Sequence, residues 1–181
     1  MKRTLLLSTA IVLFALVFFA GLCVAGEPVT KSLKTMWTGT AYVVGIGVIG
    51  DPCDGRVLVV NTAMGVSTLT GQSEWFSEYC GDFSGDYNEN FSGEGWGIFT
   101  AANGDKGFAT ITIKLTGKDI FQQETFIGGT GRFEGMTGDT MSTGTVIGDG
   151  EFPDATVYPH LIGPPSNWQA TTTGSFTFPK H

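Results

Sequence analysis

Glu124 is the side chain in this sequence whose position best suits proton chemistry. It lies in an alternating run in which Ile120, Glu124 and Phe126 share one side. A carboxyl group that faces an apolar interior has a raised pKa and can act as a general acid. The same residue could instead face outward beside Gln122, because a slip of one residue reverses the facing of a strand. Glu124 is thus a candidate catalytic residue, and the sequence alone assigns it no role.

A second set of oxygen-bearing side chains lies in an acidic stretch that contains Asp82, Asp86 and Asn88. Oxygen ligands at alternate positions are typical of calcium-binding loops. An EF-hand loop, however, needs Gly at its sixth position and Glu at its twelfth, and here these positions hold Tyr87 and Gly93. We interpret the stretch as a solvated acidic loop, with a calcium site as the alternative.

The histidine content argues against nucleophilic and zinc chemistry. A serine nucleophile needs a nearby base, which is usually His. The chain has only His160, in a proline-rich stretch, and His181 at its end, and it has no Gly-x-Ser-x-Gly motif. A zinc site with His ligands fails for the same reason. We therefore predict neither a catalytic triad nor a metal ion.

Two of the three cysteines are expected to form a disulfide. Cys23 lies in residues 1–26, which have the form of a cleaved signal peptide, as described below. Its removal would leave Cys53 and Cys80. In an exported chain, two cysteines typically pair. The bond would close a loop of 26 intervening residues, which is worth about 3–4 kcal/mol in the chain-entropy description. The alternative is two unpaired thiols.

Residues 1–26 have the form of a secretory signal peptide. Lys2 and Arg3 precede an uncharged, apolar stretch that ends in Ala25 and Gly26. A basic start, an apolar centre and small residues at the exit are the features of such a peptide. The alternatives are a transmembrane anchor, because the stretch is long enough to span a bilayer, and a lipoprotein. We expect cleavage near Ala25 or Gly26.

The composition predicts one folded, acidic domain over residues 27–181. With the signal peptide cleaved, we expect this domain to be secreted or periplasmic and free of the membrane. Only 15% of the residues are charged and 41% are hydrophobic, which argues against disorder. Removal of Lys2 and Arg3 takes away two positive charges and changes the formal net charge from -7 to -9. Because phosphate groups are bound by basic surfaces, nucleic acid is not an expected partner. The sequence does not indicate the oligomeric state.

Short alternating segments, typical of half-buried strands, dominate this domain. In the clearest of them Trp168 and Phe176 fall on one side, and Thr171 and Thr173 on the other. We predict strands at residues 35–44, 56–61, 96–102, 108–115, 120–127, 132–134, 140–147 and 168–178. We predict surface loops at residues 74–95, which are acidic, and at residues 152–167, which hold four prolines.

The tight turns between these segments predict an all-β fold without amphipathic helices. Asn103 and Gly104 form a strong hairpin signal, because both residues tolerate a positive φ. Several of the 27 glycines fall within the predicted strands, where they fit sharp bends. The pattern suits an antiparallel sandwich or a closed barrel and does not separate the two.

Two glycine-containing blocks carry a resemblance to a known family. Residues 128–135 read Gly-Gly-Thr-Gly-Arg-Phe-Glu-Gly, and residues 102–105 read Ala-Asn-Gly-Asp. In order and spacing, over about residues 95–140, they resemble bacterial secreted members of the allene oxide cyclase family, which is related to the dirigent proteins. The resemblance implies an eight-stranded antiparallel β-barrel whose mainly apolar interior holds a small molecule. Such a site needs no cofactor, because shape and a few polar groups define it.

The candidate ligand-contacting residues in this interior are aromatic: Trp37, Trp96, Phe126, Phe133 and Trp168. Trp37, Trp96 and Trp168 lie in alternating strands, so core packing is the favoured alternative to ligand contact, and in a small barrel the two roles can coincide. Plant cyclases of the family carry an acidic residue in an early strand, whereas residues 33–50 contain none. We therefore expect binding of a small apolar molecule without catalysis. The alternatives are a cyclase or isomerase that confines an apolar substrate, and a structural envelope protein whose barrel its own side chains fill.

Overall fold

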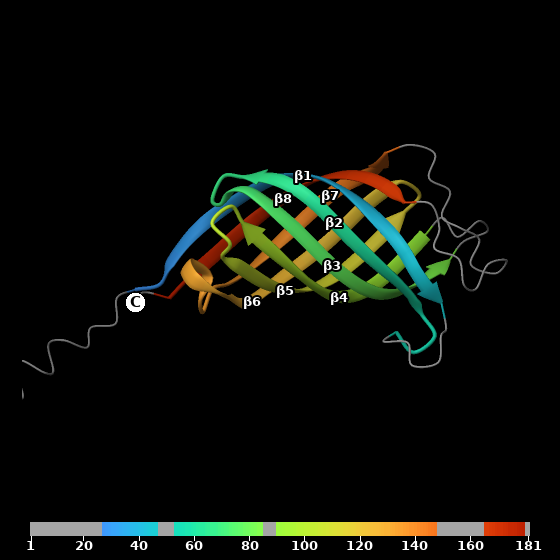
Figure 1. Cartoon of the computed structure of the whole chain (residues 1–181), viewed down its shortest axis with the longest axis horizontal. Helices are drawn as coiled ribbons and strands as arrows, with labels where there is room; N and C mark the ends of the chain where they lie inside the picture. Colours follow the sequence, from blue (N-terminus) through green and yellow to red (C-terminus); the bar gives the residue numbers. More distant parts are fainter. Residues whose placement is uncertain (1–26, 47–52, 85–89, 148–164, 180–181) are drawn as a thin grey trace, which may run out of the picture. The chain divides into compact units, whose positions relative to one another are not determined.

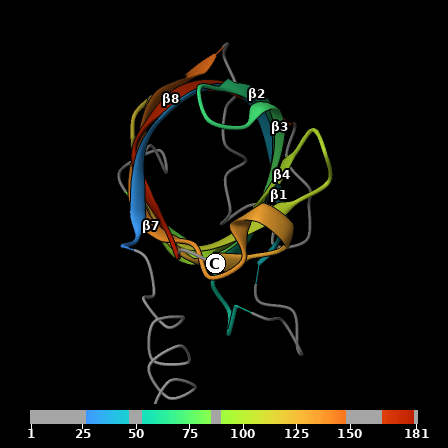
Figure 2. The same cartoon turned by 90° about the vertical axis from the view of Figure 1, so that its left-hand side faces the viewer.

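The computed structural model describes residues 27–46, 53–84, 90–147 and 165–179, which form a closed antiparallel barrel (Figures 1 and 2). Each strand pairs with its neighbours along the chain, and β8 pairs with β1 to close the ring. The strands are β1 (Val29–Ile46), β2 (Val57–Ser67), β3 (Gly71–Ser84), β4 (Asn90–Ala101), β5 (Lys106–Thr116), β6 (Asp119–Gly129), β7 (Thr137–Ile147) and β8 (Ser166–Phe178). The predicted all-β, eight-stranded antiparallel barrel is confirmed. No helix among these residues is long and apolar enough to cross a membrane.

The period-two alternation decides which residues face the interior of the barrel. In β6, Ile120, Gln122, Glu124 and Phe126 are buried, and the residues between them are exposed. A slip of one residue would turn this whole set toward solvent, so burial of the apolar members holds the register. The structure thus places Glu124 on the inner face, together with Ile120 and Phe126, as the alternation predicts.

Glycines within the strands make room for large aromatic rings inside the barrel. A Cβ on Gly39 would lie 2.4 Å from the ring of Trp168, and a Cβ on Gly65 would lie 2.3 Å from the ring of Trp37. Each ring therefore lies across the backbone of the next strand, which only a glycine permits at this distance. Two further pairs have the same arrangement: Trp75 with Gly97, and Phe99 with Gly107.

Phenylalanines fill the interior toward the end of the barrel where β6 leads into a short 3-10 helix, η1 (Gly131–Phe133). In this cluster, called the phenylalanine plug, the Phe99–Phe133 and Phe126–Phe176 ring centroids are both 4.7 Å apart. Both pairs meet edge to face, a favoured arrangement of aromatic rings. The members of the plug are Phe99, Phe126, Phe133, Phe176 and Phe178.

The predicted loop at residues 74–95 is wrong, because β3 and β4 occupy most of it. Glu74 and Glu94 lie on the outer face, whereas Ser77 and Tyr79 face the interior. The acidic side chains are typical of a solvated loop, yet those that the structure describes occupy the outer positions of these strands. Small inward residues such as Ser77 concealed the alternation, since they do not stand out as core residues.

The predicted strand at residues 132–134 is also wrong, because the chain turns into η1 there. Gly131 begins the helix with a φ of +56°, in the left-handed region that favours glycine. Of the predicted loop at residues 152–167, the structure describes only the end, where Ser166 and Asn167 already belong to β8. The rest of that loop lies outside the described residues.

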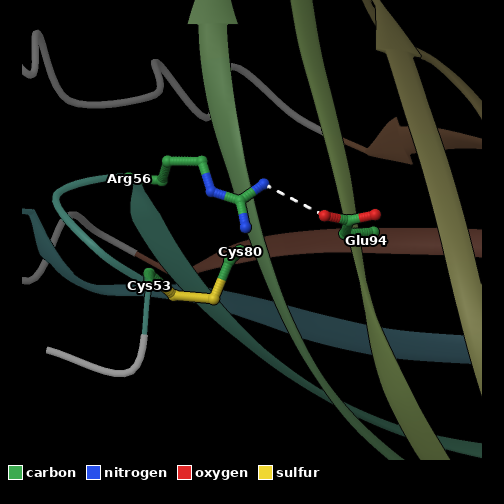
Figure 3. The surroundings of a disulfide bond; sticks show 4 residues. All are labelled: Cys53, Arg56, Cys80 and Glu94. Carbon is green, nitrogen blue, oxygen red and sulfur yellow. Dashed lines mark hydrogen bonds and ion pairs between the residues drawn. A yellow bond between two sulfur atoms is a disulfide. The ribbon is translucent and has the colours of Figure 1, made fainter.

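Cys53 and Cys80 form the expected disulfide (Figure 3). It joins the chain just before β2 to the body of β3, across a Cα–Cα distance of 5.2 Å. Nearby, Arg56 and Glu94 form an exposed ion pair at 3.4 Å. Exposed pairs of this kind contribute about 1 kcal/mol at most. Of these two side-chain links, the disulfide therefore contributes more to holding the chain at the entry to β2.

Candidate functional site

The interior of the barrel contains a cavity of about 80 Å³, and all eight strands contribute to its wall. The wall is mainly aliphatic and aromatic. For comparison, an engineered apolar cavity of about 150 Å³ in another protein admits benzene. The space that the side chains leave free here therefore suits a small or slender molecule.

Polar side chains gather around Glu124 on one side of this wall. The Nε2 atom of Gln122 donates a hydrogen bond to Oε1 of Glu124 at 2.8 Å, and the Ser142 hydroxyl donates to the same oxygen at 2.6 Å. The Thr140 hydroxyl donates to Oε2 at 2.5 Å. Thr172 forms a hydrogen bond with Ser142. The Glu124 cluster is the set Gln122, Glu124, Thr140, Ser142 and Thr172. They form a carboxyl group with several oriented donors in an otherwise apolar cavity.

A relay of hydrogen bonds links this cluster to Trp37. The indole N–H of Trp37 donates to Oγ1 of Thr172 at 3.0 Å, and Thr172 shares a short hydrogen bond with Ser142. Because Ser142 directs its own proton toward Glu124, Thr172 acts as the donor to Ser142. All the donors of the relay therefore point toward the carboxyl group, an arrangement that stabilises its ionised form.

The strand register brings these residues together. Glu124 of β6 lies opposite Thr140 of β7, and Gln122 lies opposite Ser142. In the next strand pair, Ser142 lies opposite Thr172 of β8. Opposite side chains on one face of an antiparallel pair are about 5 Å apart, close enough for direct hydrogen bonds. Sequence reasoning missed Thr140, Ser142 and Thr172, because hydroxyl residues occur on both faces of these strands.

Burial raises the pKa of Glu124, and the hydrogen bonds from Ser142, Thr140 and Gln122 act in the opposite direction. The carboxyl-bearing residue is only 3% exposed. Of the described side chains that line the cavity, only Glu124 and Tyr79 are titratable, and none is basic. No cation of the cavity wall therefore offsets the loss of hydration at this carboxyl group.

Replacing Glu124 with glutamine is expected to stabilise the protein increasingly as the pH rises. A raised pKa means that the folded state keeps its proton to a higher pH than the unfolded state does. The wild-type protein therefore loses stability as the pH rises from the ordinary pKa of Glu, about 4.3, through the raised pKa in the folded state. Glu124→Gln keeps the size of the side chain and removes this titration.

The measurement is urea unfolding of both proteins between about pH 4 and about pH 8, with the difference in unfolding free energy followed against pH. Glu74→Gln, at an exposed position of β3, is the control for removing one negative charge. The unfolding free energy of Glu124→Gln minus that of the wild-type protein should rise with pH. If this difference falls instead, the folded protein favours the ionised carboxylate.

A second polar set, called the Asn61 cluster, holds two of the tryptophans. Trp168 Nε1 donates to Oδ1 of Asn61 at 2.8 Å, and Trp75 Nε1 donates to Oγ of Ser77 at 3.1 Å. Asn61 Nδ2 donates to the same Ser77 oxygen at 3.3 Å. Burial raises the pKa of the neighbouring Tyr79, against hydrogen bonds with Ser77 and Asn61. These contacts fix the orientation of both indole rings in the wall.

Of the predicted aromatic contact residues, Trp37, Phe126 and Trp168 line the cavity. Phe133 lies in the phenylalanine plug, packed against Phe99, and is not part of the cavity wall. The structure therefore brings together only part of the predicted set.

The prediction that Trp96 lines the interior is wrong. Trp96 is 43% exposed on the outer face of β4, where its ring lies 5.6 Å from that of Phe76. Its neighbour Gly97 is the inward residue, and the ring of Trp75 covers that glycine. Because glycine shows no preference for either face, the sequence did not reveal which residue of this pair points inward. Trp75, which the prediction omitted, lines the cavity instead.

The two blocks that carry the family resemblance meet in space near η1. Lys106 N–H donates to the Thr130 hydroxyl at 3.0 Å, and Thr130 N–H donates to the Lys106 carbonyl at 2.7 Å. Oδ2 of Asp105 accepts a hydrogen bond from the Arg132 backbone N–H at 3.3 Å. These contacts fasten η1, which carries Phe133 into the plug. The role of these residues in the structure is architectural.

The calcium hypothesis falls mostly outside the described residues. Asp82 is exposed on β3, while Asp86 and Asn88 lie in the undescribed stretch 85–89. Within the part of the chain that the structure describes, no group of three or more His, Cys, Asp or Glu side chains could hold a metal ion.

Comparison of the chain with protein-family models, with curated proteins and with solved structures finds no match in any of the three.

Proposed function

We propose that this protein binds a small, mainly apolar molecule inside the barrel. The observation that carries the proposal is the cavity of about 80 Å³, whose apolar wall is interrupted by the Glu124 cluster. An apolar pocket with a few precisely placed polar groups is the usual composition of a small-molecule site. The resemblance to the allene oxide cyclase family supports the same class of ligand.

The buried carboxyl group argues against a barrel that serves only as a scaffold. Glu124 lies in the cavity wall without a basic partner there, and its raised pKa reflects the cost of removing it from water. A core that only had to be stable would gain from an apolar side chain at this position. Groups that cost stability in this way concentrate at functional sites.

Titration with small apolar compounds is expected to produce a saturable change in tryptophan fluorescence. Trp37, Trp75 and Trp168 line the cavity, so their emission depends on whether it is occupied. The probes are 1-butanol, cyclopentane, benzene and toluene. Trp96→Phe removes the signal of the exposed tryptophan and should leave the binding curve unchanged.

The control for occupancy is Ala170→Leu. Ala170 lines the cavity, so a larger side chain there should fill part of the free space and weaken binding. A linear response without saturation for all four probes, in the wild-type protein as well as in Ala170→Leu, would contradict the proposal. It would favour a barrel filled by its own side chains.

A cyclase or isomerase is the second candidate, and the position of Glu124 favours it. A buried carboxyl group with a raised pKa keeps its proton to a higher pH than a solvated one does, and it can deliver that proton to a confined apolar substrate. Chemical analysis of bound compounds after incubation distinguishes the two candidates, because an enzyme would return a changed compound and a carrier would return the same one.

A further inference from the structure

The carboxyl group of Glu124 has no positively charged partner among the described residues of the cavity wall. β5 places Ile111 opposite Glu124, and β7 places Thr140 opposite it. Among the described residues, the only other titratable side chain that lines the cavity is Tyr79, on β3, which is neutral in its protonated form. This described part of the wall supplies one carboxyl group and no cation.

The hydrogen bonds around Glu124 are nevertheless arranged for an ionised carboxylate. Gln122 and Ser142 donate to Oε1, and Thr140 donates to Oε2. Burial opposes that same charge, so the donors and the desolvation act against each other. A positive charge brought in by a ligand would resolve this conflict, because it would pair with the carboxylate that the donors already stabilise.

A further polar group lies beside the cluster. Three side-chain hydrogen bonds and a backbone contact of Glu124 itself already reach the carboxyl group. The hydroxyl group of Thr35, opposite Thr172 in β1 and β8, is buried at 1% exposure and lines the cavity. Among the described residues it has no hydrogen-bond partner. An ammonium group carries only donors, so it complements these acceptor oxygens.

The walls beside the cluster suit the rest of such a ligand. The rings of Trp37 and Trp75 lie 6.2 Å apart, and Trp168 completes the aromatic part of the wall. Aromatic faces attract cations and also pack against an aliphatic tail. The formal net charge of the chain is -7, which favours the approach of cations over that of anions.

We infer that the ligand is a small aliphatic amine, whose ammonium group pairs with Glu124 while its tail packs against the tryptophans. This inference rests on the proposed function, because it names the class of molecule that the cavity takes. An aliphatic ammonium is already protonated at neutral pH. Pairing therefore requires Glu124 to be ionised, and a carboxyl group that is protonated in the free protein must release its proton to the buffer.

Calorimetric titration with butylamine, 1-butanol and butyrate tests the inference, since the three probes share a tail and differ in the head group. In the wild-type protein, butylamine is expected to bind about tenfold to a hundredfold more tightly than 1-butanol, and butyrate more weakly than either. Repeating the butylamine titration in two buffers of different ionisation enthalpy measures proton release. Release should be largest below the pKa of Glu124 in the free protein and should vanish above it.

Glu124→Gln should abolish both the preference for butylamine and the proton release, while 1-butanol still binds. Glu74→Gln, on the outer face of β3, should keep both. If Glu124→Gln does not fold, the measurement of proton release decides the question in the wild-type protein alone. Ammonium chloride is the remaining probe, and it should bind far more weakly than butylamine because it lacks the tail.

The outcomes separate the inference from the function on which it rests. Two results would overturn the inference of an amine ligand and leave the proposed function standing. One is equal affinity for butylamine and 1-butanol; the other is butylamine binding that releases no proton at every pH tested. Proton release by ammonium chloride equal to that of butylamine would mean a site for a bare cation, which also overturns the inference. Binding of none of the three butyl probes would overturn both.

Discussion

Replacing Phe176 with alanine is expected to lower the free energy of unfolding by about 3–5 kcal/mol. Phe176 is 1% exposed and stands between Phe126, at 4.7 Å, and Phe99, at 6.1 Å. Removing its ring leaves a void that the closed barrel cannot collapse to fill, because hydrogen bonds to both neighbouring strands hold β8 in place. For a domain of this size the loss corresponds to a melting temperature lower by about 6–20 °C.

Thermal and urea unfolding of Phe176→Ala measure this loss. The matched control is Phe121→Ala in β6, which removes another phenylalanine ring, from a residue that is 49% exposed on the outer face. The loss of unfolding free energy in this control should be far smaller. Phe176 also lines the cavity, so the variant should admit larger probes, such as toluene, more readily than the wild-type protein does. A loss below about 1 kcal/mol would mean that the phenylalanine plug is not a packed core.

Loss of the disulfide is the second large effect. Replacing Cys53 and Cys80 together with serine is expected to cost about 2–4 kcal/mol of unfolding free energy. The bond joins residues 27 positions apart, so its removal frees the unfolded chain more than it disturbs the folded barrel. Urea unfolding with and without a reducing agent provides the measurement: reduction should destabilise the wild-type protein and leave the double variant unchanged.

Arg56→Gln is the control for this region, because it removes the neighbouring ion pair with Glu94 and keeps the disulfide. Its cost should not exceed about 1 kcal/mol. Equal stability of the oxidised and reduced wild-type protein would show that β2 and β3 need no covalent link, and that strand pairing alone holds the entry to β2.

The functional proposals depend on a wall that keeps its shape. The plug fills the barrel near η1, and the Asn61 cluster fixes Trp75 and Trp168 by hydrogen bonds to their indole nitrogens. Rigid aromatic walls lose little conformational freedom when a ligand binds, which favours binding in a small cavity. Stability of the barrel and affinity for a ligand therefore depend on many of the same side chains.

Local patterns in the sequence were sufficient where a few neighbouring residues decide the outcome. Alternation in residues 120–127 predicted a strand with Ile120, Glu124 and Phe126 on one face; the facing of Glu124 stayed open in the sequence, and the structure places it inward. Asn103 and Gly104 form the predicted tight turn, with Gly104 at a φ of +86°. Cys53 and Cys80, the two cysteines outside the predicted signal peptide, form the predicted pair. Each of these features depends on residue type and short spacing, which the sequence states directly.

The same patterns failed where the side chains that mark a face were missing or misleading. Glycines on both sides of Trp96 left its facing undecided, and the structure places it outside. Acidic residues in residues 74–95 are typical of a loop, although the described ones lie on the outer faces of β3 and β4. At Gly131 the left-handed backbone begins a helix where alternation predicted a strand.

The sequence by itself determined most of the strands, because alternation over a few residues is a local property. Alternation did not distinguish a sandwich from a barrel and the resemblance implied the barrel; the tertiary structure shows the closed ring, in which β8 lies beside β1. It also decided that Thr140, Ser142 and Thr172 surround Glu124, since these neighbours come from different strands. Register and closure depend on pairing between distant segments, and no short stretch of the chain contains that information.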